Sequence, residues 1–421
     1  MERYDKYINT GVSWMPRIPS HWKYLQFRGL FKITKRIAGR TGLDVLAVTQ
    51  RGIKVKDVES NEGQIAADYS NYQIVEPGDF AMNHMDLITG FVGISPQFGV
   101  TSPDYRVFKN ISPLASSQFY LYIFELCYKQ QIFYGLGHGV SNKGRWRLPA
   151  PIQNRFEIPL PPLAEQEKIV SYLEDKTSKI NAYVADKEKE IELLQELKQK
   201  TIADAVTKGL NPDAKMKDSG ISWIGDIPEH WEVKKIGSLF IERREKVSDK
   251  EYPALSVSKQ GITPQLDTAV KTDNGDNRKK VCKNDFVVNS RSDRKGSCGV
   301  SPYTGSVSLI NIVLSPRENI EVQYFHHLFR SNDYIEEYYR IGRGIVADLW
   351  TTRYSEMRNI MIPFPPLDEQ QAIVAYINEK TAKVESLITD LQAEIEHLKE
   401  YKQRLIADCV TGQVNVQNET I

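Results

Sequence analysis

The chain has 421 residues, of which 41% are hydrophobic and 26% are charged, with a formal net charge of +1. This composition excludes a collagen-like or wholly disordered chain, and four cysteines without metal-ligand spacing exclude a disulfide scaffold and fit a reducing cytoplasm. No segment approaches the ~18 consecutive apolar residues of a membrane span, and the first residues lack the apolar core of a signal peptide, so we expect a cytoplasmic protein.

Two stretches, residues 20–158 and 229–362, mix short apolar strands with turn signals and aromatic-rich helices, which predicts an α+β fold. In the first stretch, strands are expected at Leu43–Val48, Gln73–Val75 and Asp79–Met82, and a helix at Ser116–Gln131. In the second, strands are expected at Lys280–Cys282 and Asp285–Asn289, and a helix at Val322–Arg340.

The chain contains two copies of one plan. The first repeated motif is GVSWMPRIPSHW, from Gly11 to Trp22, and its second copy is GISWIGDIPEHW, 209 residues later. The second repeated segment is residues 161–207, whose copy is residues 365–411, with 24 of 47 positions identical. The segments between these motifs diverge. The predicted organisation is a first globular domain at 1–160, a long helix at 161–208, a linker at 209–219, a second globular domain at 220–364, a second long helix at 365–412 and a flexible tail at 413–421.

The copied segments have the pattern of long helices that pair with each other. Apolar residues recur three and four positions apart over several heptads, which indicates a coiled-coil seam. Each helix is expected to start after a Pro-Pro pair with a glutamate in its first turn. The alternative is that each helix packs only on its own domain. The predicted seam consists of Val170, Leu173, Ile180, Val184, Ile191, Leu194, Val374, Ile377, Val384, Ile388, Leu391, Ile395 and Leu398.

Positive charge is concentrated in the divergent parts. Residues 1–160 hold 19 Lys and Arg against 13 Asp and Glu, whereas residues 365–421 hold 5 against 10. Basic globular domains with acidic helices suit a nucleic-acid surface, because phosphate neutralisation supplies much of the affinity for DNA. Residues 211–364, which include the second domain, contain 23 basic and 21 acidic residues. This near balance is also what ordinary solvated lysines would give.

Common catalytic signatures are missing from the sequence. It contains no GxxxxGK[ST] phosphate loop, no GxSxG elbow and no HExxH zinc motif. His21 and His230 recur beside tryptophan in the IPxHW motif, and we interpret them as packed anchors. These features do not support an enzyme that acts alone, and no metal site is expected.

The duplicated SWxxxIPxHW motif, the variable middle and the PFPPLxEQxxI helix start at Phe364–Ile373 resemble the specificity subunits of type I restriction–modification systems. The first copy of the helix start, Leu160–Ile169, has Leu in place of Phe. The stretch PGDFAMNHMDLITGFVGIS at Pro77–Ser95 is also similar to target-recognition domains of that family. The resemblance covers nearly the whole chain.

The resemblance implies two target-recognition domains separated by an antiparallel two-helix coiled coil with pseudo-two-fold symmetry. Each domain would read one half of a bipartite site in double-stranded DNA, and the coil would fix the unread spacer. The implied partners are two modification subunits, which are adenine methyltransferases that use S-adenosylmethionine, and two restriction subunits driven by ATP and Mg²⁺. The specificity subunit itself would be non-catalytic and bind no cofactor.

Candidate base- and phosphate-contacting residues follow two predicted strands and occupy two later loops. Asn can bridge adenine N6 and N7, and Arg can bridge guanine O6 and N7. Asn83 and Asn289 recur in both domains, so each is equally a candidate to hold a turn, and we interpret Trp146 and Trp350 as core residues. The candidates are Asn83, His84, Asn142, Lys143, Arg145, Arg147, Asn289, Arg291, Arg294, Lys295, Arg343 and Arg353.

Two other functions stay open on sequence grounds. One is a structural coiled-coil adapter whose domains bind proteins, which would show no salt-dependent duplex binding. The other is an enzyme with an unrecognised pocket, which would show turnover when the isolated chain is screened.

Overall fold

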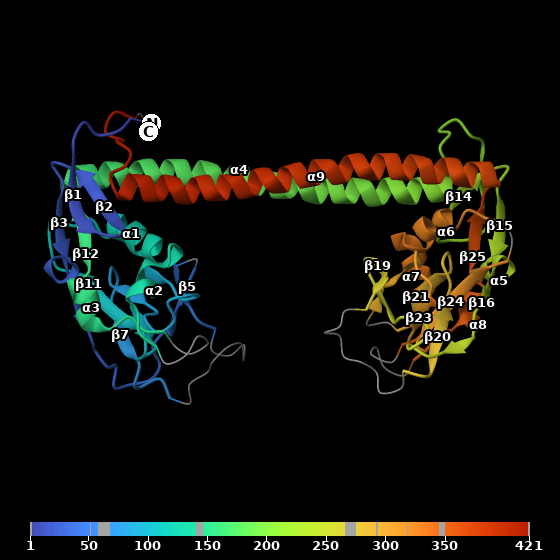
Figure 1. The fold of residues 1–421 in the computed structure, drawn as a ribbon, viewed down its shortest axis with the longest axis horizontal. Helices are drawn as coiled ribbons and strands as arrows, with labels where there is room; N and C mark the ends of the chain where they lie inside the picture. Colours follow the sequence, from blue (N-terminus) through green and yellow to red (C-terminus); the bar gives the residue numbers. More distant parts are fainter. Residues whose placement is uncertain are drawn as a thin grey trace. The chain divides into compact units, whose positions relative to one another are not determined.

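The structure is a computed structural model that describes residues 2–50, 52–57, 68–139, 146–265, 275–291, 294–317, 319–344 and 350–419. The chain forms two compact units, of which the first contains Met1–Asp186 and Ala393–Ile421 and the second contains Lys187–Gln392. The long helices α4 (Leu163–Lys208) and α9 (Leu367–Val410) are each shared between the two units (Figure 1). We call residues 20–158 the first head and residues 229–362 the second head.

In the first unit, a four-stranded antiparallel sheet has the order β4-β11-β8-β9, and short two-stranded ladders surround it. The elements are β1 (Tyr7–Val12), β2 (Met15–Pro19), β3 (Lys23–Gln26), the 3₁₀ turn η1 (Phe27–Gly29), β4 (Phe31–Thr34), β5 (Leu46–Thr49), β6 (Gly52–Val55), β7 (Gln73–Val75), β8 (Phe80–Met82), β9 (Val92–Ile94), β10 (Gly99–Thr101), β11 (Arg106–Asn110), α1 (Ser117–Lys129), α2 (Ile132–Leu136), α3 (Ala150–Arg155) and β12 (Glu157–Leu160).

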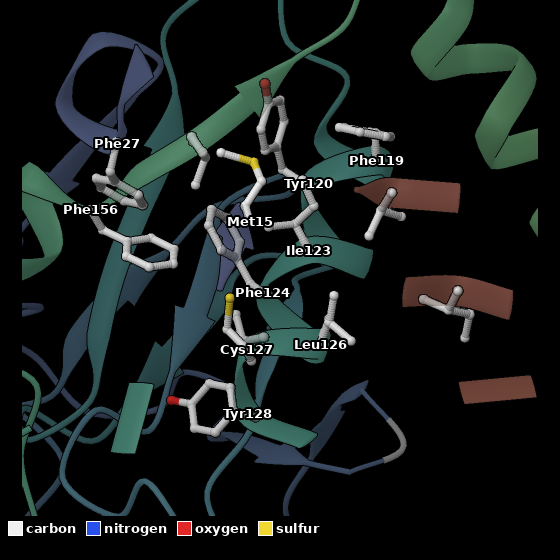
Figure 2. Close-up of a cluster of buried hydrophobic side chains, with 14 of the residues drawn as sticks. Met15, Phe27, Phe119, Tyr120, Ile123, Phe124, Leu126, Cys127, Tyr128 and Phe156 are labelled. Atoms are coloured by element: carbon white, nitrogen blue, oxygen red, sulfur yellow. The ribbon is translucent and has the colours of Figure 1, made fainter. Parts of the chain in front are cut away.

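The two faces of this sheet bury different clusters, as the alternation of side chains along a strand requires. Phe80 and Phe108 stack with ring centroids 4.9 Å apart and face Phe124 of α1. Ala81 and Val107 point to the opposite face, where β5, β6 and β7 cover them. Figure 2 shows Phe124 of α1 and Phe27 among the buried side chains of the larger cluster.

The second unit repeats the plan with the sheet order β16-β24-β21-β22, and α6 covers the face to which Phe286 and Leu314 point. Val287 and Val313 point to the other face. The elements are β13 (Met216–Asp218), β14 (Asp226–Pro228), β15 (Glu232–Lys235), α5 (Ile236–Leu239), β16 (Phe240–Glu242), β17 (Lys246–Val247), β18 (Leu255–Ser258), β19 (Gly261–Pro264), β20 (Arg278–Val281), β21 (Phe286–Asn289), β22 (Cys298–Val300), β23 (Gly305–Val307), β24 (Asn311–Pro316), α6 (Val322–Phe329), α7 (Asn332–Arg340), α8 (Tyr354–Met357) and β25 (Met361–Phe364).

The predicted α+β class is confirmed, and one expected helix is divided. The single helix expected over Val322–Arg340 is two helices, α6 and α7. The division occurs at Ser331, whose hydroxyl accepts a hydrogen bond from the backbone N–H of Tyr334 and so caps the start of α7. The single-helix prediction was therefore wrong at this position.

Within each unit, α4 and α9 run antiparallel. In the first unit the Nζ of Lys402 lies 2.6 Å from Oδ1 of Asn181, and in the second Lys198 lies 2.5 Å from Glu385. All thirteen predicted seam residues are buried or half-buried, from Leu173 and Ile377 at 0% exposure to half-buried residues such as Val184. The seam positions therefore lie on the covered sides of both helices.

The duplicated IPxHW and PPLxEQ motifs contact each other in both units. Glu165 in the first turn of α4 accepts a hydrogen bond from the Trp22 indole at 3.0 Å and lies 2.9 Å from His21 Nε2. Glu369 in the first turn of α9 has the same two partners, Trp231 at 2.8 Å and His230 at 2.5 Å. Both copies of the motifs therefore make the same contact. The His21 and His230 side chains are nevertheless 48% and 54% exposed, so the interpretation of both histidines as packed residues was wrong, and the buried residue of each pair is the tryptophan.

The glutamine that follows each glutamate ties the head to its long helix. Gln166 accepts a hydrogen bond from the backbone N–H of Ser116, the residue that caps α1, at 2.8 Å. Gln370 accepts one from the backbone N–H of Glu321, which caps α6, at 3.0 Å. The Glu-Gln pair therefore connects the long helix to the His-Trp pair at the start of the head and to the head's aromatic helix.

The C-terminal residues of the chain pack on the first unit. We expected a flexible tail over 413–421, whereas Val414 and Val416 are 7% and 0% exposed in the core of this unit. The backbone N–H of Asn415 donates to the carbonyl of Glu2 at 2.9 Å. No helix in the described ranges is long and apolar enough to cross a membrane.

Candidate nucleic-acid interface

Asn83 and Asn289 follow equivalent strands, β8 and β21, and hold the turns that come next. The side-chain oxygen of Asn83 accepts hydrogen bonds from the backbone N–H groups of Met85 and Asp86, both at 3.2 Å. The side-chain oxygen of Asn289 accepts one from Arg291 N–H at 3.1 Å. A short polar side chain that bonds to the backbone two residues ahead is typical of an Asx turn. The two asparagines therefore position the residues that follow them.

His84 is half-buried and does not supply positive charge at neutral pH. Burial, together with the nearby positive charges of Arg106 and Arg147, lowers the pKa of His84 to about 4. Arg106 is itself buried and donates to the Leu148 carbonyl at 2.8 Å, so it belongs to the core of the head. Of the other candidates in the first head, Arg147 is exposed. Asn142, Lys143 and Arg145 lie outside the described residues.

Trp146 and Trp350 occupy equivalent positions, each directly before a residue that forms a backbone bridge. The indole of Trp146 donates to the Tyr134 carbonyl at 2.7 Å, and that of Trp350 donates to the Tyr339 carbonyl at 2.9 Å. Each indole lies against a glycine, Gly137 or Gly342, and a Cβ there would come within 2.6 or 2.4 Å of the ring. Both tryptophans thus have structural roles. Trp146 packs against the core of the first unit, whereas Trp350 is half-buried and belongs to no core cluster of the described residues, so the interpretation as core residues fits Trp146 better.

The second head has a surface hollow of about 610 Å³ at the end of β21. Arg291 and Arg353 lie in it and are exposed, and neither side chain has an ion-pair partner among the described residues. Leu309 and Ile310, which are 40% and 38% exposed, add apolar surface. The other charged residues of the hollow are Arg244, Lys246, Lys279 and Glu242.

Part of the charge in this hollow is already neutralised. Glu242 lies 2.7 Å from Arg244 and 3.1 Å from Lys279. The hollow therefore keeps a positive balance that Arg291, Arg353 and Lys246 supply. Sequence reasoning missed Arg244, Lys246 and Lys279, although the run ERREK at 242–246 gave a charge signal for the first two.

The other predicted residues of the second head lie outside this hollow. Lys295 forms an ion pair with Glu336 and lies over the Tyr339 ring at 5.4 Å, while Arg294 is exposed nearby. Arg343 is exposed, and its backbone pairs with that of Thr351, which in turn lines the hollow. Arg291 and Arg353 thus line one hollow, whereas Arg294 and Lys295 do not line it, although the backbone N–H of Arg294 donates to the Arg291 carbonyl at 3.2 Å.

A hollow of about 590 Å³ in the first head also borders the turn after β8, although the rest of its lining, which includes β5, does not correspond to that of the second head's hollow, and its charge differs. It contains Asp86 and Asp104 together with Lys56 and Tyr72. Burial favours the neutral form of Asp86, but hydrogen bonds from Thr89, Ile88 and Gly90 outweigh it and lower the pKa of this carboxyl. A charged carboxylate accepts hydrogen bonds and donates none, as the amino group of cytosine requires.

Among the described residues no group of His, Cys, Asp and Glu is arranged to hold a metal ion. Cys127, Cys298 and Cys409 are buried, and burial raises the pKa of the Cys298 and Cys409 thiols to about 12. These thiols are therefore unreactive packing residues rather than nucleophiles.

The family model of the type I restriction modification DNA specificity domain matches residues 19–193 and 228–397, so the chain belongs to this family. The type I restriction enzyme MjaVIII specificity subunit of Methanocaldococcus jannaschii is 25% identical over 287 residues, which cover 63% of this chain and 64% of that protein. The EcoBI specificity subunit of Escherichia coli is 23% identical over 288 residues, which cover 62% and 59%. The chain thus spans about three-fifths of the length of these curated relatives.

Two solved structures share the fold. A chain from a study of assembly and conformational transition in a type I restriction–modification system has a TM-score of 0.67 at 16% identity, with 94% of this chain and 99% of that chain covered. The HsdS subunit of Thermoanaerobacter tengcongensis has a TM-score of 0.50 at 17% identity, with 94% and 98% covered.

Proposed function

We propose that this chain is the DNA-reading subunit of a type I restriction–modification complex, in which each head recognises one half of a bipartite duplex site. The observation that carries the proposal is that a hollow borders the equivalent turn, after β8 or after β21, in each of two copies of one fold. Their different chemistry, carboxylates in one and arginines in the other, is what two half-sites of different sequence require.

The helices α4 and α9 would set the unread spacer between the half-sites, because a paired helix has a fixed rise per residue. The chain would carry two modification subunits, which use S-adenosylmethionine, and two restriction subunits, which use ATP and Mg²⁺. We propose that it is itself non-catalytic and binds none of these cofactors. A protein-binding adapter is less well supported, because the basic hollow of the second head suits an anionic ligand.

The double variant Arg291→Ala/Arg353→Ala tests this proposal. In the complex with modification subunits, we expect duplex affinity to fall about tenfold for each arginine, because one good charged contact contributes ~1–3 kcal/mol. If both arginines contact phosphates, the slope of log K against log salt also falls by about 1.8. The measurement is fluorescence anisotropy with the cognate duplex over a range of salt concentrations.

The matched control is Lys235→Ala/Lys283→Ala, which removes the same charge from exposed positions of the second head outside the hollow. We expect this control to bind DNA as the wild type does. Equal binding by the arginine variant and the wild type would remove the hollow from the DNA interface.

A further inference from the structure

The internal duplication allows the same position to be compared in the two units, and the comparison identifies a pocket. In the first unit, Glu165 has a third partner, because the Tyr4 hydroxyl donates a hydrogen bond to its Oε1 atom. The Tyr4 ring packs 5.5 Å from the His21 ring and 5.9 Å from the Trp22 ring. Tyr4 thereby covers the anchor, and the Glu165 side chain is 7% exposed.

In the second unit, the covering tyrosine is absent. The offset of 209 that relates the two IPxHW motifs places Asp213 at the position of Tyr4, and Asp213 is exposed. A carboxylate there cannot donate to Glu369 and would be repelled by it. The Glu369 side chain is accordingly 37% exposed, although its bonds to His230 and Trp231 match those of Glu165.

A pocket of about 220 Å³ lies beside the uncovered glutamate. Its walls are mainly apolar, with Pro228, Ile373 and Ala372 on one part and Leu210 and Ala214 on another. Leu210 is 41% exposed, so part of the apolar wall is accessible to an incoming group. The pocket thus combines an apolar wall with one carboxylate acceptor, which is the combination that Tyr4 satisfies in the first unit.

We propose that this pocket receives a tyrosine side chain of the modification subunit, which repeats at Glu369 the contacts that Tyr4 makes at Glu165. The proposal rests on the proposed function for the identity of the partner. The pocket is lined by residues of the copied motifs and of the linker, and among the described residues the only lining residue within the second head is His230 of the IPxHW motif, so its occupant does not depend on the divergent residues that would read DNA. Because Tyr4 already fills the first site, the two modification subunits contact the chain differently.

The first test uses the full chain labelled with 5-fluorotryptophan, and its probe is p-cresol, the side-chain analogue of tyrosine. The chain has six tryptophans, and substitution of each one by phenylalanine assigns the fluorine signals. We expect p-cresol to shift the Trp231 signal saturably and to leave the Trp22 signal in place. Toluene, which has no hydroxyl to donate to Glu369, should shift Trp231 less.

Two reciprocal variants control this measurement. Asp213→Tyr should fill the pocket from within and abolish the response of Trp231 to p-cresol. Tyr4→Ala should open the first site, so that Trp22 begins to respond. If p-cresol fails to shift Trp231 in the unaltered chain, the pocket does not bind a phenol and the proposal is wrong.

The second test uses the assembled complex. With the modification subunit bound, Trp231 should be insensitive to p-cresol. Asp213 is the neighbour of the lining residue Ala214, and Asp213→Tyr should weaken assembly at least tenfold relative to Lys217→Tyr, which adds the same side chain at an exposed site that is not next to a lining residue. A complex that assembles and methylates DNA while Trp231 still responds to p-cresol would overturn this proposal and leave the proposed function intact. A chain that binds no modification subunit would refute both.

Discussion

Replacement of residues 20–158 by the equivalent segment of another specificity subunit is expected to change one half of the methylated site and to leave the other half unchanged. The physical reason is that each head has its own core. The buried cluster around Phe80 and Phe124 is formed within the first unit, and the cluster around Phe286 and Phe329 within the second. A new first head therefore does not require a repacked second head.

The exchange preserves the contacts that orient the head if the new segment also starts with His-Trp. These two residues bond to Glu165, and the backbone of Ser116 bonds to Gln166, so the long helix can stay as it is. The measurement is sequencing of methylated bases in cells that carry the hybrid. The reciprocal exchange of residues 229–362 should change the other half-site. A hybrid that changes both halves would contradict independent reading by the heads.

The second large effect is expected from Trp231→Ala, which should destabilise the second unit by about 3–5 kcal/mol, as truncation of a large buried aromatic side chain does. Trp231 is fully buried, and its indole is a hydrogen-bond donor to Glu369. The substitution leaves a cavity and also removes a partner from a half-buried carboxylate. Urea denaturation followed by circular dichroism measures the loss, with each unit treated as its own transition.

Two variants separate the causes of this loss. Trp231→Phe keeps most of the packing and removes the indole N–H, so it should lose much less stability than the alanine variant. Trp223→Ala is the matched control, because Trp223 belongs to the same motif but is only partly buried, and its indole nitrogen has no hydrogen-bond partner. If Trp231→Ala were no more destabilising than this control, Trp231 would not be an anchor of the fold.

Features with a regular period were predictable from the sequence. The 3–4 spacing of apolar residues placed the seam positions of α4 and α9, and all of them lie on covered sides of these helices. The strands β7, β8 and β21 also lie within or very near the expected ranges, because short apolar runs between turn residues are typical of buried strands. The aromatic helix of the first head, α1, likewise matched its apolar pattern.

Contacts between distant residues were not predictable in the same way. The bond between Trp22 and Glu165 joins residues 143 positions apart, and no local pattern encodes it. The hollow of the second head collects Arg244, Lys279, Arg291 and Arg353 from four separate segments. The sequence identified Arg291 and Arg353 as basic residues in loops, but only the fold shows that they share one surface and that Lys295 is paired elsewhere.

The comparison of Asn83 with Asn289 decides one alternative that the sequence left open. Both side chains hold the turn after an equivalent strand, so their recurrence reflects backbone geometry. The residues that differ between the heads are those around these turns, with carboxylates at one hollow and arginines at the other. A duplicated framework with different side chains around one shared turn is the arrangement expected of two independent readers of base edges.

The most direct test of the central claim is single-molecule sequencing of methylated adenines in the host, with and without the gene for this chain. We predict one bipartite motif, two defined half-sites around an unread spacer, that is methylated in the presence of the gene and unmethylated in its absence. An identical methylation pattern in both strains, or a gene-dependent motif that is continuous and undivided, would contradict the account.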